Sequence, residues 1–156
     1  MKKRIYSLLI VLVFSMAIFA TAHRVQAALG EPTDSVESDR EALSAVPGTI
    51  TVRNGYTVQE FNSDSTIVRE YISPSGVVFA IAWNGLVHPD LTQLLGSYAG
   101  EYQEALEQTP REPDRRRLLV KANQVVVEKW GHMRNLQGRA YVPALIPPGV
   151  SVDEIK

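Results

Sequence analysis

The pattern of apolar positions centres on residues 68–83, VREYISPSGVVFAIAW, where two runs rich in β-branched and aromatic residues flank a short polar segment. Such runs on either side of a turn signal are typical of a β-hairpin. Pro74 suits the first central position of a turn, and Gly76 can adopt the left-handed conformation that closes a type I turn with a bulge. We therefore predict an antiparallel hairpin across this turn.

The turn also predicts which side chains of the hairpin share a face, because a three-residue loop sets Ser73 opposite Val77. One face is then large and aromatic, and the other is smaller and more polar. The large face pairs Tyr71 with Phe79, Arg69 with Ile81, and Ile67 with Trp83. The small face pairs Ile72 with Val78, Glu70 with Ala80, and Val68 with Ala82. We expect a helix to cover the large face.

Further strand patterns lie on both sides of this hairpin. Residues 49–61 carry two strand-like pieces separated by an Asn-Gly turn signal, and residues 120–130 and 133–142 form a second hairpin across Gly131-His132. Connections this short join antiparallel strands. The sequence therefore predicts an antiparallel sheet of about five strands, a three-stranded meander plus the C-terminal hairpin.

Helical periodicity is clearest in residues 90–108, where apolar residues recur at i, i+3, i+4 and i+7. Asp90 and Gln93 resemble a capping box at its start. This long amphipathic helix is expected to cover the sheet. Residues 36–46 predict a short N-terminal helix with a weak apolar stripe, and residues 144–156, with adjacent prolines and a glycine, predict an extended tail.

The first 27 residues have the pattern of a secretory signal peptide. Three basic residues precede an apolar run over residues 5–22. Two sites, Ala20-Thr21-Ala22 and Val25-Gln26-Ala27, satisfy the small-x-small rule for cleavage, and we prefer the second because the mature chain then starts at Ala28. The alternative is an uncleaved anchor, since about 18 apolar residues is the lower limit for spanning a bilayer. The predicted division is a cleaved signal peptide (1–27), a single α+β domain (28–143) and an extended C-terminal tail (144–156).

Charge and cysteine content limit the possible partners. The predicted leader contains four of the 16 basic residues and none of the 17 acidic residues, so the mature chain would carry a net charge of −5. This argues against a nucleic-acid partner and against electrostatic adsorption to an anionic membrane, and cleavage of the leader leaves no stable membrane insertion. The absence of cysteine excludes disulfides, thiol catalysis and cysteine metal sites.

Candidate catalytic groups are few. His88 and His132 are the only histidines after the leader, and neither lies in a metal-binding motif, so we predict no metal and no cofactor. A hydrolase could use His88 or His132 with Glu70 or Glu128, although glutamates on strands more often lie on a solvated face. We therefore assign no catalytic residue and keep an envelope hydrolase as the alternative.

Two further sets of residues are candidates for a functional role: Glu70, and a group of side chains on the second hairpin. Glu70 alternates with apolar residues of its strand, and we expect it to be a buried acid with an arginine partner on a neighbouring strand. Trp130, His132, Arg134 and Arg139 place aromatic, imidazole and guanidinium groups on one hairpin, which is chemistry that contacts carboxylates, sugars or protein partners. The alternative is ordinary decoration of an edge strand.

Several short sequence motifs, spread over nearly the whole mature chain, occur together: Ala28-Leu29-Gly30, Val68-Arg69-Glu70-Tyr71, Ala82-Trp83, Pro89-Asp90-Leu91, Gly131-His132-Met133-Arg134, Gly138-Arg139-Ala140-Tyr141 and Gly149-Val150-Ser151. This combination resembles a bacterial family of exported proteins, domain of unknown function 2844. The resemblance implies a periplasmic or secreted protein of a Gram-negative bacterium and implies no activity. We therefore expect an exported, non-catalytic binding or accessory protein of the cell envelope, whose partner is an envelope protein or a small ligand.

Overall fold

The computed structural model describes residues 29–156 except 34, 64 and 111–115. The predicted signal peptide and its cleavage site therefore lie outside the described residues. Among the residues that are described, no helix is long and apolar enough to cross a membrane.

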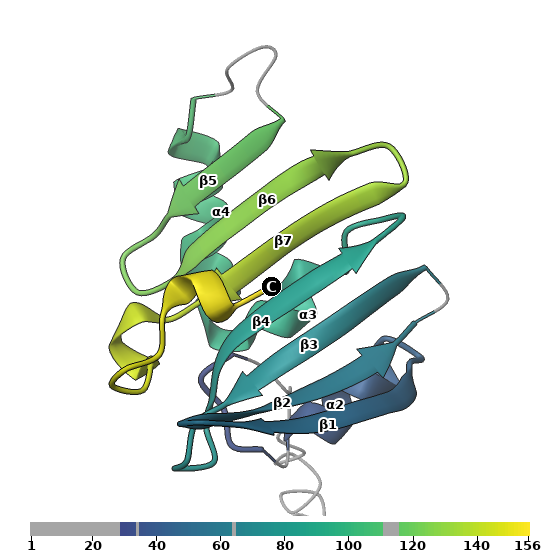
Figure 1. Ribbon diagram of the computed structural model, residues 1–156. Coiled ribbons are helices and arrows are strands. Elements are labelled where there is room, and N and C mark those ends of the chain that lie inside the picture. Colours follow the sequence, from purple (N-terminus) through teal and green to yellow (C-terminus); the bar gives the residue numbers. More distant parts are fainter. Residues whose placement is uncertain (1–28, 34, 64, 111–115) are drawn as a thin grey trace, which may run out of the picture.

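The described chain forms a seven-stranded antiparallel sheet in the order β1-β2-β3-β4-β7-β6-β5 (Figure 1). Its strands are β1 (Val46–Arg53), β2 (Tyr56–Asn62), β3 (Thr66–Ile72), β4 (Val78–Gly85), β5 (Arg117–Lys121), β6 (Val126–His132) and β7 (Asn135–Tyr141). The α+β class is confirmed, but the prediction of about five strands is too low. Residues 120–130 are not one strand, because a turn in which the Ala122 N–H donates to the Val125 carbonyl separates β5 from β6.

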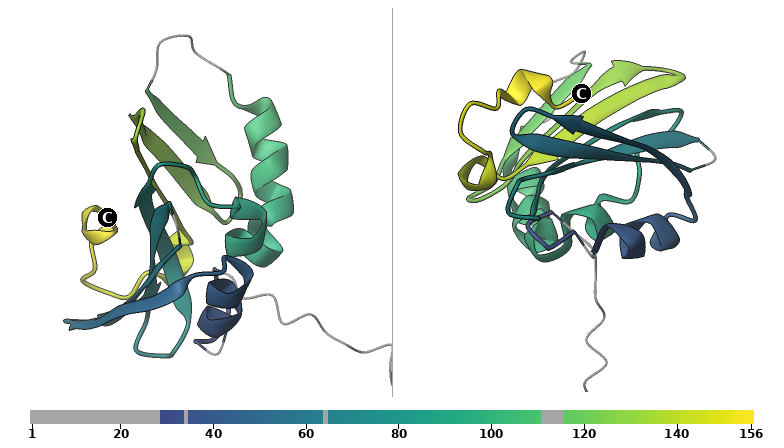
Figure 2. Two further views of the ribbon diagram at one scale, coloured as in Figure 1. Left: turned by 90° about the vertical axis from the view of Figure 1, so that its right-hand side faces the viewer. Right: turned by 60° about the horizontal axis from the view of Figure 1, so that its bottom comes forward.

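Helices cover one face of this sheet, which we call the helix face (Figure 2). They are α2 (Ser35–Ala42), α3 (Leu91–Leu95), the 3₁₀ turn η2 (Gly96–Tyr98) and α4 (Ala99–Gln108). The helical segment predicted from residue 90 begins as expected, with the Asp90 side chain accepting the Thr92 N–H at 2.9 Å. It is interrupted at Gly96, whose φ of +49° is outside the helical range, so α3 and α4 are separate pieces.

The C-terminal tail lies on the opposite face, which we call the tail face (Figures 1 and 2). Instead of running out extended, it contains the 3₁₀ turns η3 (Pro143–Leu145) and η4 (Val152–Glu154). Ile155 is completely buried against the sheet. It belongs to a second hydrophobic core on the tail face, made by Tyr56, Tyr71, Phe79, Ala80, Ala82 and Ile155.

The central hairpin has its predicted turn but not its predicted register. Ser73 N–H donates to the Val77 carbonyl at 2.9 Å, and Gly76 has a φ of +79°, as expected. A bulge follows, because Ile72 pairs with Val78 while Tyr71 pairs with Ala80, which leaves Phe79 as an extra residue in β4.

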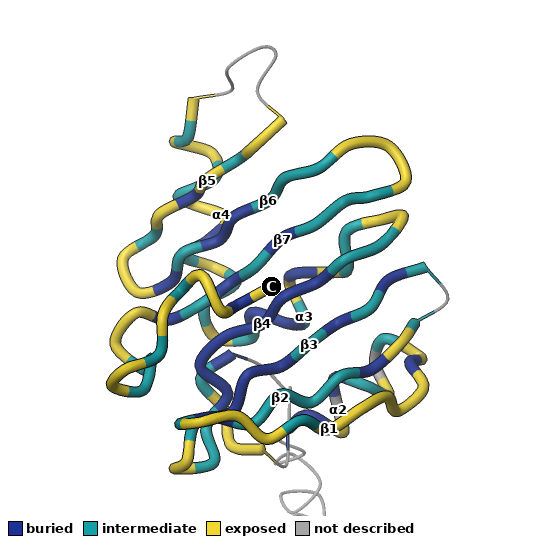
Figure 3. Tube along the Cα trace, viewed as in Figure 1, coloured by how far each residue is buried: buried dark blue, intermediate teal, exposed yellow. Residues whose placement is uncertain are grey.

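A shift of one residue exchanges the two faces of a strand. The predicted large face is therefore divided: Ile81 and Trp83 belong to the core under the helices, whereas Tyr71 and Phe79 belong to the core under the tail. As a result, β4 is buried on both sides over residues 78–83 (Figure 3).

Candidate binding surface

The predicted contact residues lie around the β6–β7 hairpin, whose turn differs from the prediction. His132 pairs with Asn135, so the turn residues are Met133 and Arg134 rather than Gly131 and His132. Arg134, the second turn residue, has a φ of +69°, which few non-glycine residues adopt. Met133 is 90% exposed, so this turn is the accessible tip of the hairpin.

Strand alternation places Trp130 and His132 on the tail face. Trp130 pairs with Gln137, and Gln137 also pairs with Asn84 of β4, so their side chains lie together across three strands. Arg134 is in the turn itself and is exposed, as is His132. The structure thus brings Trp130 and His132 onto one surface, with Arg134 at its rim.

The part of the tail face that the C-terminal tail leaves open is hollowed. Two adjoining hollows, with volumes of about 800 and about 590 Å³, share Trp130, Gln137 and Lys156 in their walls. Volumes in this range are typical of small-molecule sites. The first hollow extends over β2 and β3 to Tyr56 and Arg69.

Amide side chains form a connected row beside Trp130, and two of them, Asn84 and Gln137, lie in the wall of the larger hollow. The Trp130 Nε1–H donates to Gln137 Oε1 at 3.2 Å, and Gln137 Nε2 donates to Asn135 Oδ1 at 3.0 Å. Asn84 Nδ2 donates to the same Asn135 oxygen at 2.9 Å. These bonds fix the orientation of all four side chains before any ligand arrives. Sequence reasoning missed the three amides because their shared face follows from the pairing of β4 with β7, which the hairpin pattern alone does not give.

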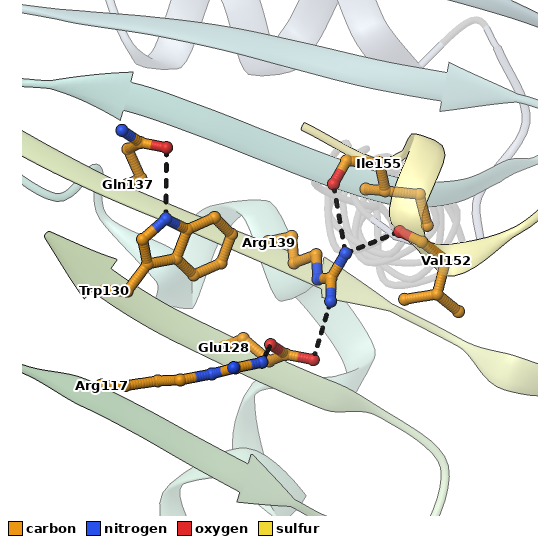
Figure 4. Close-up of polar contacts among 7 residues, drawn as sticks. All are labelled: Arg117, Glu128, Trp130, Gln137, Arg139, Val152 and Ile155. Carbon is orange, nitrogen blue, oxygen red and sulfur yellow. Dashed lines mark hydrogen bonds and ion pairs between the residues drawn. The ribbon is translucent and has the colours of Figure 1, made fainter.

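Arg139, the fourth predicted contact residue, is engaged within the protein (Figure 4). Its guanidinium donates to the Val152 carbonyl at 2.6 Å and to the Ile155 carbonyl at 3.4 Å, and its side chain is only 12% exposed. The same group lies 5.8 Å from the centre of the Trp130 ring, a cation–π distance. Arg139 therefore ties the tail to the sheet and contacts Trp130.

Glu128 completes this cluster. Its carboxylate forms ion pairs with Arg139, at 3.2 Å, and with Arg117 on the neighbouring strand. Burial raises the pKa of Glu128, but the hydrogen bonds and charges of the two arginines outweigh it, so the pKa lies below its ordinary value. Glu128 is thus held as an anion at neutral pH and is poorly suited to donate a proton.

Glu70 is buried, as the sequence predicts, but the prediction that an arginine pairs with it is wrong. It pairs with Ile81, faces the helices and is completely buried. Its neighbour is Asp39 of α2, and neither Glu70 side-chain oxygen has a hydrogen-bond partner within the described residues. Burial, followed by the Asp39 hydrogen bond and charge, raises the pKa of Glu70 well above its ordinary value.

Asp39 is itself almost completely buried, and burial raises its pKa to about 6 although the hydrogen bond from Glu70 opposes the shift. A Glu70 that stays protonated beside Asp39 therefore accounts for the raised pKa and for the lack of a cationic partner within the described residues. This pair could not be predicted from the sequence, because Asp39 lies in a helix with a weak apolar stripe and the predicted register placed Glu70 on the other face.

His88 contacts Trp83 and is not in the wall of either hollow. Its Nδ1 accepts the Trp83 Nε1–H at 2.8 Å, and burial, together with the charge of Lys129, lowers its pKa. Over the described residues, neither His88 nor His132 contacts a carboxylate, and no three histidine, aspartate or glutamate side chains gather as a metal site would require.

A family model described as "Protein of unknown function (DUF2844)" matches residues 25–155. The chain belongs to this family. The matched range includes all seven strands and reaches Ile155, so the DUF2844 domain comprises the tail as well as the sheet. No curated protein and no solved structure matches the chain.

Proposed function

We propose that this DUF2844 protein is a non-catalytic binding or accessory protein of the bacterial cell envelope, and that its contact surface is the open tail face beside Trp130. The observation that carries the proposal is the row of hydrogen-bonded amides next to a half-buried indole in a hollowed surface. Polar groups that converge in a cleft are the usual sign of a binding site. His132 and Arg134 lie at the rim of this surface, and Arg139 positions Trp130 and the tail.

The state of the candidate acids and bases supports binding over catalysis. General acid–base chemistry needs a titratable group that can reach the substrate. Glu128 is paired with two arginines, Glu70 is completely buried and His88 is bonded to Trp83 on the helix face. His132 is exposed but, within the described residues, bonds only to the Met133 carbonyl and to no carboxylate, so nothing there favours the hydrolase alternative.

Export is part of the proposal and rests on the sequence of residues 1–27. We propose a periplasmic or secreted location in a Gram-negative bacterium, with the mature chain starting at Ala28. Intact-mass measurement of the protein recovered from a cell-envelope extract tests this step. A mass that includes Met1 would contradict cleavage and favour the anchored alternative.

Site-specific photo-cross-linking in intact cells tests the contact surface. A photoreactive residue at Met133, at the exposed tip of the hairpin, should give an adduct, whereas one at the exposed Glu107 on α4 should not. Adding Trp130→Ala to the first variant should abolish the adduct while the protein remains folded by circular dichroism. An adduct that forms equally from both positions, or that survives Trp130→Ala, would refute the proposed surface.

A further inference from the structure

We propose that the ligand of this surface is an uncharged glycan strand, with a sugar ring stacked on Trp130 and sugar hydroxyls bonded to Asn84, Asn135 and Gln137. This inference rests on the proposed function and specifies its ligand class. Four properties of the surface support it: a fixed aromatic platform, unused amide groups, balanced charge and an elongated shape.

The platform is the Trp130 indole. In Figure 4 the ring is seen nearly face-on over β6 and β7, and none of the other side chains drawn crosses it. Its Nε1–H is bonded to Gln137, and Arg139 lies 5.8 Å from the ring centre, so the ring is held in one orientation. An aromatic face carries a partial negative charge and attracts the weakly positive C–H groups that sugar rings present. A ring already held in place loses little entropy on binding.

The amides supply hydrogen bonds of both kinds. Each carboxamide has two N–H donors and an oxygen with two lone pairs. The row uses only part of this capacity: within the described residues, the Asn135 Nδ2 and the Asn84 Oδ1 make no hydrogen bond, and Gln137 Nε2 makes one. Donors and acceptors therefore remain side by side. Hydroxyl groups, which donate and accept, match such a row better than groups that only donate or only accept.

Three of the arginines around the platform are already paired with carboxylates. Arg69 pairs with Glu60 at 2.8 Å, and Arg139 and Arg117 share Glu128. An anionic ligand would have to compete with these carboxylates for the arginines. In the larger hollow, the basic Arg53, Arg69 and Lys156 face the acidic Glu60 and Glu154, which leaves little net charge. The surface thus favours an uncharged ligand.

The shape suits a chain rather than a single sugar. The two hollows adjoin at Trp130, Gln137 and Lys156, so a ligand can continue from one into the other across the sheet. One hollow reaches Tyr56 on β2 and the other reaches Arg117 on β5, at opposite sides of Trp130. A strand of several sugars can therefore contact both while one of its rings lies on the indole.

Titration calorimetry with protein expressed from the full-length sequence tests this inference. The probes are soluble oligomers of β-1,4-glucose, β-1,4-N-acetylglucosamine and α-1,4-glucose, with oligogalacturonate as the charged counterpart. At least one neutral oligomer should bind, and it should bind more tightly than oligogalacturonate. Trp130→Ala should weaken that binding by about tenfold, and Trp130→Phe should retain most of it. Lys121→Ala, an exposed change on β5 outside both hollows, is the matched control and should have no effect.

Failure of the inference is distinguishable from failure of the proposed function. If no neutral oligomer binds, if oligogalacturonate binds best, or if Trp130→Ala binds as the unchanged protein does, the glycan inference is overturned. The binding function still stands if the Met133 cross-link then yields a protease-sensitive adduct that depends on Trp130. If that adduct is also absent, both are overturned.

Discussion

Replacing Glu70 by glutamine gives the sharpest test of the buried carboxyl pair. Glutamine has nearly the shape of a protonated glutamate and can still donate to Asp39. Because the pKa of Glu70 is raised in the folded protein, the folded state keeps a proton that the unfolded chain loses above its ordinary pKa of about 4.5. The free energy of unfolding contributed by Glu70 is therefore fully present below that pH and declines as pH rises toward the folded pKa.

The expected magnitude follows from proton linkage. Retaining one extra proton in the folded state lowers the free energy of unfolding by up to about 1.4 kcal/mol per pH unit. The glutamine variant lacks this decline, so its stability relative to the unchanged protein should grow at up to that rate above pH 4.5. Asp39 titrates in both proteins, with a pKa raised to about 6 by burial, and its contribution largely cancels in the comparison.

Urea denaturation at several values between pH 4 and pH 8 measures this difference. The matched control is Glu60→Gln on the tail face, where the same change removes a partly exposed ion pair with Arg69 and should lower stability by up to about 1 kcal/mol. A Glu70→Gln variant that is less stable than the unchanged protein at pH 7, or a difference that does not grow with pH, would contradict a Glu70 that stays protonated in the folded protein.

Two further pairs of variants test the tail and the sheet by urea denaturation. Arg139→Ala should lower the free energy of unfolding by about 3 kcal/mol because it removes a buried ion pair and both tail contacts, whereas Arg134→Gly, at a positive φ, should leave stability within about 1 kcal/mol. Equal effects would contradict the assignment of Arg139 to the tail. Gly138→Ala would place a Cβ 2.2 Å from the Trp83 ring and should cost about 3 kcal/mol, while Gly100→Ala, with nothing within 4 Å, should stabilise α4 by up to about 1 kcal/mol. A tolerated Gly138→Ala would mean that Trp83 does not lie across β7.

The fold class could be predicted from sequence because local signals agree with it. The Pro74–Gly76 turn, the apolar spacing after Asp90 and the short strand connections each specify a local structure, and an antiparallel sheet with covering helices satisfies all of them. The short edge strand β5 could not be recognised as a separate strand because it directly follows a charged, proline-containing segment. The turn at Met133-Arg134 could not be predicted because its arginine has a positive φ, and nothing in the sequence indicates this conformation.

The register could not be predicted, for a reason specific to β4. Residues 78–83 are apolar at every position, so no alternation shows which side chains face which layer. A bulge of one residue at Phe79 therefore leaves no trace in the hydrophobic pattern, yet it exchanges the faces of residues 80–83 relative to β3. The amides of the binding surface are positioned by the pairing of β4 with β7. Because the register of β4 could not be predicted, these amides could not be predicted either.

The absence of alternating apolar and polar residues in β4 is nevertheless explained by the position of the C-terminal tail. A strand that is apolar on both faces must be covered on both, and here the helices cover one face while the tail, through Ile155, covers the other. The apolar run stops at Trp83, and the next residue on the tail face is Asn84, the first amide of the row. The change from apolar to polar along β4 therefore marks where the cover of the tail ends and the open surface begins. Arg139, paired with Ala82 just before this boundary, holds the tail at that limit and so fixes the edge of the proposed binding surface.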